Sequence, residues 1–125
     1  MKKMFVVFLG LVLLPAIAYA DGFSVSKKSG DVTVKVSMEN PVVGSNEIAL
    51  ELLGADGSPI TDAKVELDYF MPSMPAMRYK VTAESRDGGY AAVLKLAMAG
   101  RWSVGVSFTR PGGEPEKITF SIDAK

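Results

Sequence analysis

Residues 101–108 read RWSVGVSF, and this stretch decides the fold class. Its large apolar residues stand at every second position, with small or polar residues between them. Side chains of a β-strand alternate between the two faces of a sheet, so this period of two predicts a strand with one buried face. Trp102 is in phase with Val104 and Val106, and we expect its indole in the core of the domain.

The same alternation recurs along the chain in both directions from this stretch. It covers residues 31–38, 47–52, 64–69, 78–82, 90–96 and 117–122. Val93 adds an apolar residue between the alternating positions of its run, so we expect that strand to be buried on both faces. Residues 23–25 are expected to add a short edge strand, and no window after Ala20 has the periodicity of a helix.

Turn-forming residues separate these runs at short intervals. They are Asn40-Pro41, Gly44-Ser45-Asn46, Asp56-Gly57-Ser58-Pro59, Asp87-Gly88-Gly89 and Pro111-Gly112-Gly113. Asp-Gly between two alternating runs is a strong signal for a β-hairpin. About seven strands at this spacing predict an all-β fold, an immunoglobulin-like antiparallel β-sandwich that forms one domain over residues 21–125.

The first twenty residues have the features of a secretory signal peptide. Lys2 and Lys3 precede an apolar run over residues 4–14, and Ala18-Tyr19-Ala20 provides small residues for cleavage. An uncleaved anchor is the alternative, but the run is short for a membrane span of ~20 residues. We therefore expect residues 1–20 to be removed and residues 21–125 to be periplasmic or secreted, without membrane insertion.

The composition excludes several classes of function. The chain contains no cysteine and no histidine, which removes zinc sites built on thiolate or imidazole and the nucleophiles that depend on histidine. Without residues 1–20, twelve basic and fourteen acidic residues remain. A nearly neutral domain has no electrostatic reason to bind nucleic acid, and we expect no enzymatic activity.

Residues 69–77, YFMPSMPAM, contain three of the seven methionines. Pro72 and Pro75 fix their own φ angles and donate no backbone hydrogen bond, and each pushes the preceding methionine out of the α region. The segment is therefore expected to be a stiff, extended connection and not a helix or a central strand. In regular β geometry Met71 and Met77 share a face and Met74 points away, so a site using all three sulfurs requires a bend.

Thioether sulfur is a soft, uncharged ligand that suits Cu(I) or Ag(I) better than zinc, magnesium or calcium. Met71, Met74 and Met77 are therefore candidate ligands, and Met98 is a fourth because loops cluster at the ends of a sandwich. Two other interpretations remain open, because methionine also fills irregular cores and forms adaptable surfaces for partner proteins. Met38, at the end of its own run, is expected in the core.

Three stretches together resemble the YtkA-like domain family. They are residues 57–65, residues 71–77 and residues 89–104, and they span most of the chain after the signal segment. The resemblance implies an immunoglobulin-like sandwich outside the cytoplasm, no enzymatic activity, and an association with heavy-metal efflux adaptors and FixH-type proteins. It also places the three clustered methionines in the methionine motif of the family, and Gly100 and Trp102 in its Gly-x-Trp element.

Two functional hypotheses follow. The first is a periplasmic domain that binds Cu(I) or Ag(I) through Met71, Met74, Met77 and Met98, with Tyr69, Phe70 and Trp102 shielding the site from water. The second is an interaction module whose apolar tip docks on an envelope partner, such as an efflux or cytochrome-assembly component, without a metal of its own.

Overall fold

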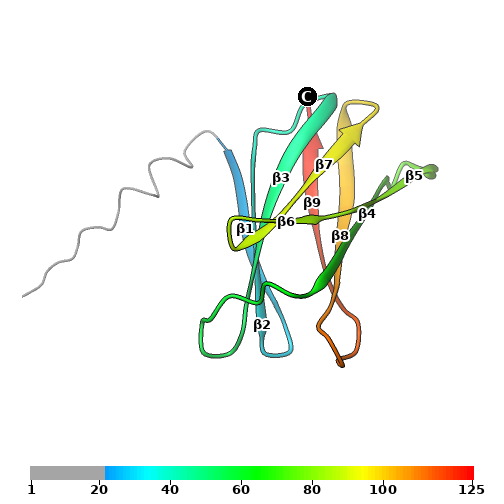
Figure 1. Ribbon diagram of the computed structural model, residues 1–125. Helices are drawn as coiled ribbons and strands as arrows, with labels where there is room; N and C mark the ends of the chain where they lie inside the picture. The colour runs from blue at the N-terminus through cyan, green and yellow to red at the C-terminus, as the bar shows by residue number, and fades with distance from the viewer. Residues whose placement is uncertain (1–21) are drawn as a thin grey trace, which may run out of the picture.

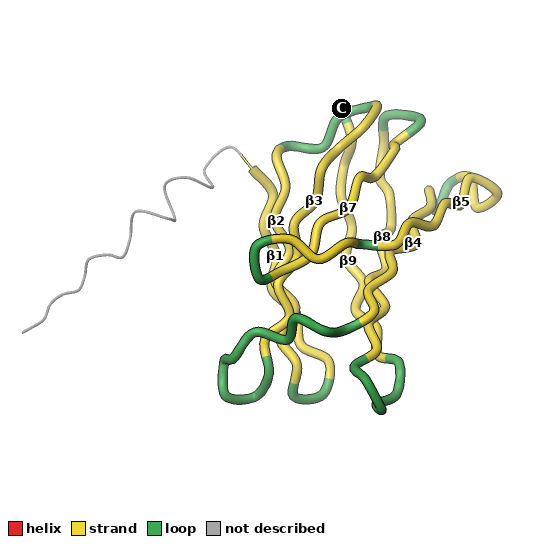
Figure 2. The backbone as a smooth tube through the Cα atoms, in the orientation of Figure 1, coloured by secondary structure: helices red, strands yellow, loops and turns green. Residues whose placement is uncertain are grey.

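A computed structural model describes residues 22–125, and the expected signal peptide lies outside these residues. The strands are β1 (Gly22–Ser29), β2 (Val32–Glu39), β3 (Gly44–Leu53), β4 (Lys64–Met71), β5 (Met74–Thr82), β6 (Glu84–Arg86), β7 (Gly89–Leu96), β8 (Gly100–Thr109) and β9 (Glu116–Ala124). Figure 2 shows only strands and loops in this part of the chain. No helix among the described residues has the length and apolar character of a membrane span.

The strands form two antiparallel sheets that pack as a sandwich, as the alternation predicts (Figure 1). One sheet has the order β1-β2-β3-β7-β6 and the other the order β5-β4-β8-β9. The inward-facing side chains of both sheets form one core, in which Trp102, Val104 and Val106 are fully buried. The apolar face predicted for residues 101–108 is therefore the face of β8 that packs in the core.

The structure differs from the expected strands at three places. The N-terminal edge strand runs over the whole of β1 and not only over residues 23–25, and the short β6 had no clear signal in the sequence. On β7, Tyr90, Ala91 and Ala92 are buried, but Val93 is 42 % exposed. The expectation that both faces of this strand are buried is therefore wrong from Val93 onward, because none of the strands and loops within residues 22–125 covers the outer face there.

Turn chemistry determines the hairpin between β6 and β7. Asp87 and Gly88 have φ angles of 51° and 81°, and Arg86 pairs with Gly89 across them. Two central residues with positive φ form the turn whose twist matches that of paired strands. The hairpin predicted from Asp87-Gly88 is thus confirmed.

The connections of the sandwich gather at two opposite ends. The β1–β2, β3–β4 and β8–β9 connections lie at one end, and the β2–β3 and β7–β8 connections lie at the other, beside the C-terminus (Figure 1). Backbone hydrogen bonds from Val43 to Lys125 and from Lys125 to Pro41 tie the C-terminus to the β2–β3 connection. We call this second end, together with the tip of the β4–β5 hairpin, the methionine pole.

Candidate metal centre

The methionine segment forms a hairpin and not an extended connection, so that expectation is wrong. β4 continues to Met71, β5 begins at Met74, and only Pro72 and Ser73 lie between them. Neither Pro72 nor Ser73 has a positive φ. Proline cannot adopt a positive φ, so Pro72 excludes the turn types with a positive φ at the first central position. Such a turn does not match the twist of a regular hairpin, and the strands must adjust next to it.

The adjustment is a bulge in the β4–β5 pairing. Phe70 pairs with Arg78, but the next residue, Met71, pairs with Met74. Residues 75–77 are therefore additional residues on β5 with no partners on β4. Pro75 is tolerated here because it lies in this unpaired stretch of β5, which is an edge strand. Residues 74–77 are therefore not in a central strand, as expected, whereas Met71 ends β4, which lies between β5 and β8.

The turn and the bulge place two thioethers on one face. Residues directly opposite each other in an antiparallel pair project to the same side, with their Cβ atoms ~5 Å apart. Met71 and Met74 are such a pair, and Met71 is buried whereas Met74 is 43 % exposed. Met77 is half-buried and packs against the core cluster that includes Met71. The required bend is present, and all three methionines lie around the tip of the hairpin.

Three aromatic rings form the floor beneath the hairpin tip. Tyr69 on β4, Tyr79 on β5 and Trp102 on β8 are mutual neighbours, with ring centroids 5.5 to 6.1 Å apart. The Tyr69 hydroxyl accepts a hydrogen bond of 2.9 Å from the Lys95 backbone N–H, which links this sheet to β7. Tyr69 and Trp102 are buried, and Tyr79 remains partly exposed at the open edge of β5.

The β7–β8 connection approaches the same region from above. The Trp102 indole N–H donates a hydrogen bond of 3.0 Å to the Met98 carbonyl, while the Met98 residue is 42 % exposed. Gly100 has a φ of 130°, and a Cβ atom built on it would lie 2.9 Å from the Met71 Cε. The first residue of β8, directly after the connection, therefore lies against the terminal methyl group of Met71.

Phe70 lies on the other side of the sheet and does not join the cluster. It stands between Tyr69 and Met71, both of which face the core, and the Arg78 guanidinium lies 4.2 Å from the centroid of its ring. The role expected for Phe70 in shielding the metal does not fit this position. Strand alternation counted from Tyr69 would have placed it on the outer face.

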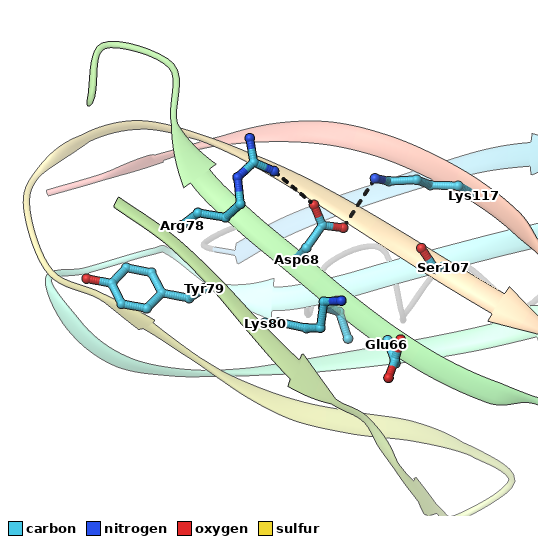
Figure 3. Close-up of a pocket in the computed structure, with 8 residues that line it drawn as sticks. Glu66, Asp68, Arg78, Tyr79, Lys80, Ser107 and Lys117 are labelled. Atoms are coloured by element: carbon cyan, nitrogen blue, oxygen red, sulfur yellow. Dashed lines mark ion pairs between the residues drawn. The ribbon is translucent and has the colours of Figure 1, made fainter. Parts of the chain in front are cut away.

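The outer face of β5-β4-β8-β9 carries a separate ionic cluster. Asp68 on β4 forms ion pairs with Arg78 at 3.7 Å and with Lys117 at 3.3 Å (Figure 3). Lys117 is on β9, so its side chain must cross β8, and it does so over Gly105. Figure 3 shows Arg78 and Lys117 converging on Asp68, with the ring of Tyr79 directed away from them.

Sequence reasoning did not assign two residues, Tyr79 and Gly100, to the candidate site. Tyr79 alternates with Arg78 and Lys80 in the sequence, so its inward face was predictable, but its contact with Trp102 across β4 requires the strand order. Gly100 was associated with the family motif, and its contact with Met71 depends on the path of a loop. Among the described residues, no group of three or more histidine, cysteine, aspartate or glutamate side chains is arranged to hold a metal ion.

The sequence model of the YtkA-like family matches residues 26–107. The chain belongs to the YtkA-like family. The matched region contains β2 to β7, most of β8, and thus the whole hairpin tip with its aromatic floor. The predicted family resemblance is confirmed. No curated protein matches this YtkA-like chain in sequence.

Two solved structures have a similar fold. FetP of uropathogenic E. coli strain F11, expressed in the periplasm of E. coli, has a TM-score of 0.67 and 10 % identity, and the match covers 83 % of this chain and 96 % of FetP. The PmoD soluble domain from Methylocystis sp. ATCC 49242 (Rockwell) has a TM-score of 0.53 and 16 % identity, covering 80 % of this chain and 96 % of that domain. At these identities the similarity establishes the fold of the YtkA-like chain.

Proposed function

We propose that this YtkA-like chain is a periplasmic, non-enzymatic domain that binds a soft monovalent metal ion, Cu(I) or Ag(I), at the tip of the β4–β5 hairpin. The observation that carries the proposal is the pairing of Met71 with Met74, since directly opposite residues present their side chains on one face. Met77 lies three residues further along β5, packs against the core cluster, and is the third candidate ligand. The apolar run and small residues of positions 1–20 support export.

The surroundings of these sulfurs suit a thioether site. Met71 is buried against the core, whereas Met74 is open to solvent, so an ion could enter from the side of Met74 and be held over an apolar floor. Thioethers do not titrate, and they prefer soft cations to the oxygen-seeking cations magnesium and calcium. When bound, the ion would supply no chemistry of its own here, and the residues would serve to hold it and to exclude water.

The test is an anaerobic titration of the chain with Ag(I) and with Cu(I) under a competing chelator. Replacing Met71, Met74 and Met77 together with leucine keeps the apolar volume and removes the sulfurs. Loss of an outer-shell partner already costs about 10- to 100-fold in metal affinity, so loss of the ligands should cost at least that much. Met38→Leu is the matched control, because Met38 is a buried core residue on β2. Equal affinity in the triple variant and in wild type would reject the proposal.

A second function, a docking module for an envelope protein, is favoured by the distribution of exposed apolar side chains. Within residues 22–125, the most exposed large apolar residues are Val42, Val43, Met74, Tyr79, Val93 and Met98. Val42, Val43 and Met98 are in connections of the methionine pole, Met74 begins β5 at the hairpin tip, and the other two are in β5 and β7. This function predicts that the triple leucine variant still binds its partner, an efflux or cytochrome-assembly component, and that Met74→Ser does not.

A further inference from the structure

The β7–β8 connection and the first residue of β8 make two contacts with the region of the hairpin tip. The buried Trp102 indole donates to the Met98 carbonyl, although this carbonyl lies in an exposed connection at the surface. Two residues further along, Gly100 leaves the space that the Met71 methyl group occupies. The connection is therefore fixed to the aromatic floor on one side and to a candidate ligand on the other.

We propose that Met98 is a ligand from the second connection, and that Trp102 is the positioning residue that holds it there. This inference rests on the proposed function of the hairpin. The hydrogen bond fixes the Met98 backbone rather than its sulfur, so the thioether stays free to close over an ion bound between Met71 and Met74. Met98 is 42 % exposed and Met74 is 43 % exposed, so both sulfurs can be reached from solvent.

Preorganisation is the physical reason for such an arrangement. A methionine in a flexible loop loses much conformational entropy when it binds an ion. The Trp102 hydrogen bond restricts the backbone before binding, and outer-shell hydrogen bonds of this kind orient the ligands of metal sites. Gly100 contributes by letting the connection approach Met71 closely, because a side chain at this position would meet the Met71 Cε.

The test is a double-mutant cycle measured by Ag(I) competition titration on the full chain. The four proteins are wild type, Met98→Leu, Trp102→Phe and the double variant. Met98→Leu should weaken Ag(I) binding by about 10-fold or more, and Trp102→Phe should weaken it by about 10-fold. Because Trp102 acts through Met98, the double variant should bind no more weakly than Met98→Leu alone, whereas a purely structural effect of Trp102 would add to that of Met98.

The outcomes separate this inference from the proposed function. If Met98→Leu binds Ag(I) as wild type does while the hairpin triple variant does not, the hairpin site stands and the role of Met98 is overturned. Additive effects in the cycle would overturn the positioning role of Trp102.

A second measurement keeps the inference testable if Trp102→Phe fails to fold. NMR spectra of isotope-labelled methionine methyl groups in the wild-type chain should show the Met98 signal moving together with those of Met71 and Met74 as Ag(I) is added. The Met38 signal should stay in place. Movement of the hairpin signals alone would overturn the inference.

Discussion

At the scale of single residues, Gly100 combines two constraints that other residue types cannot meet together. Its φ of 130° lies in a region that residues with a side chain rarely adopt, and its Cα faces the Met71 methyl group. Gly44 shares the first constraint, with a φ of 112°, but no atom lies within 4 Å of a Cβ built on it. Comparing substitutions at the two glycines therefore separates the cost of backbone strain, which both share, from the cost of steric contact, which only Gly100 has.

Gly100→Ala should destabilise the domain more than Gly44→Ala does. Both variants pay a backbone cost of about 1–3 kcal/mol, and only Gly100→Ala also displaces Met71. Urea unfolding of both variants measures the difference. Equal losses of unfolding free energy would contradict the close contact between Gly100 and Met71.

At the scale of elements, the β4–β5 hairpin shows what the sequence could not predict. Proline geometry correctly excludes a helix and keeps both prolines out of the central strands, but it leaves the choice between an extended connection and a tight turn open. The choice depends on the bulge at Phe70 and Met71, which needs the pairing partners of β4. Trp102 and Met38 were correctly predicted to be buried, because alternation within a single strand determines the face on which each side chain lies.

Gly105 lies in the middle of β8, where the Lys117 side chain from β9 crosses over it to reach Asp68 on β4. A Cβ built on it would lie 2.5 Å from the Lys117 Cε and 2.8 Å from the Asp68 Oδ1. Gly105→Val should therefore break the Lys117–Asp68 ion pair, and we expect a loss of about 1 kcal/mol, because both partners are near solvent. Urea unfolding provides the measurement.

Ser103→Val is the control for Gly105→Val. Ser103 lies on the same face of the same strand, beside Phe70 and Ser121. Ser103→Val introduces the same β-branched side chain outside the place where Lys117 crosses β8 over Gly105. If the two variants are equally stable, the crossing of Lys117 over β8 makes no contribution.

Asp56 in the β3–β4 connection should make the stability of the fold depend on pH. The backbone N–H and the hydroxyl of Ser58 donate hydrogen bonds to Asp56 and lower the pKa of its carboxyl below the usual value. A carboxyl with a lower pKa in the folded state stabilises the fold above its unfolded pKa, and this contribution is lost as pH falls through the folded pKa.

Asp56→Asn isolates that contribution, because asparagine keeps an acceptor oxygen and removes the charge. Wild type should be slightly more stable than the variant at neutral pH, and the difference should shrink below about pH 4. The effect is small because Asp56 is exposed. A difference in thermal stability that stays constant from neutral to acidic pH would contradict this assignment.

At the scale of the whole molecule, the two ends of the sandwich differ in character. The methionine pole carries four exposed apolar side chains, those of Val42, Val43, Met74 and Met98. The opposite end has turns rich in glycine and charged residues, at residues 30–31, 54–59 and 110–115. The fold class was predictable because alternation is a local feature of the sequence. The difference between the two ends was not predictable, since it depends on which connections meet at each end.

The central claim is that thioethers of the β4–β5 hairpin bind a monovalent soft ion. X-ray absorption spectroscopy of the chain after anaerobic loading with Cu(I) and removal of free metal tests it most directly. We predict a first coordination shell made only of sulfur, which disappears in the Met71→Leu, Met74→Leu double variant and persists in Met38→Leu. A shell of nitrogen or oxygen ligands, or the same sulfur shell in the double variant, would contradict the account.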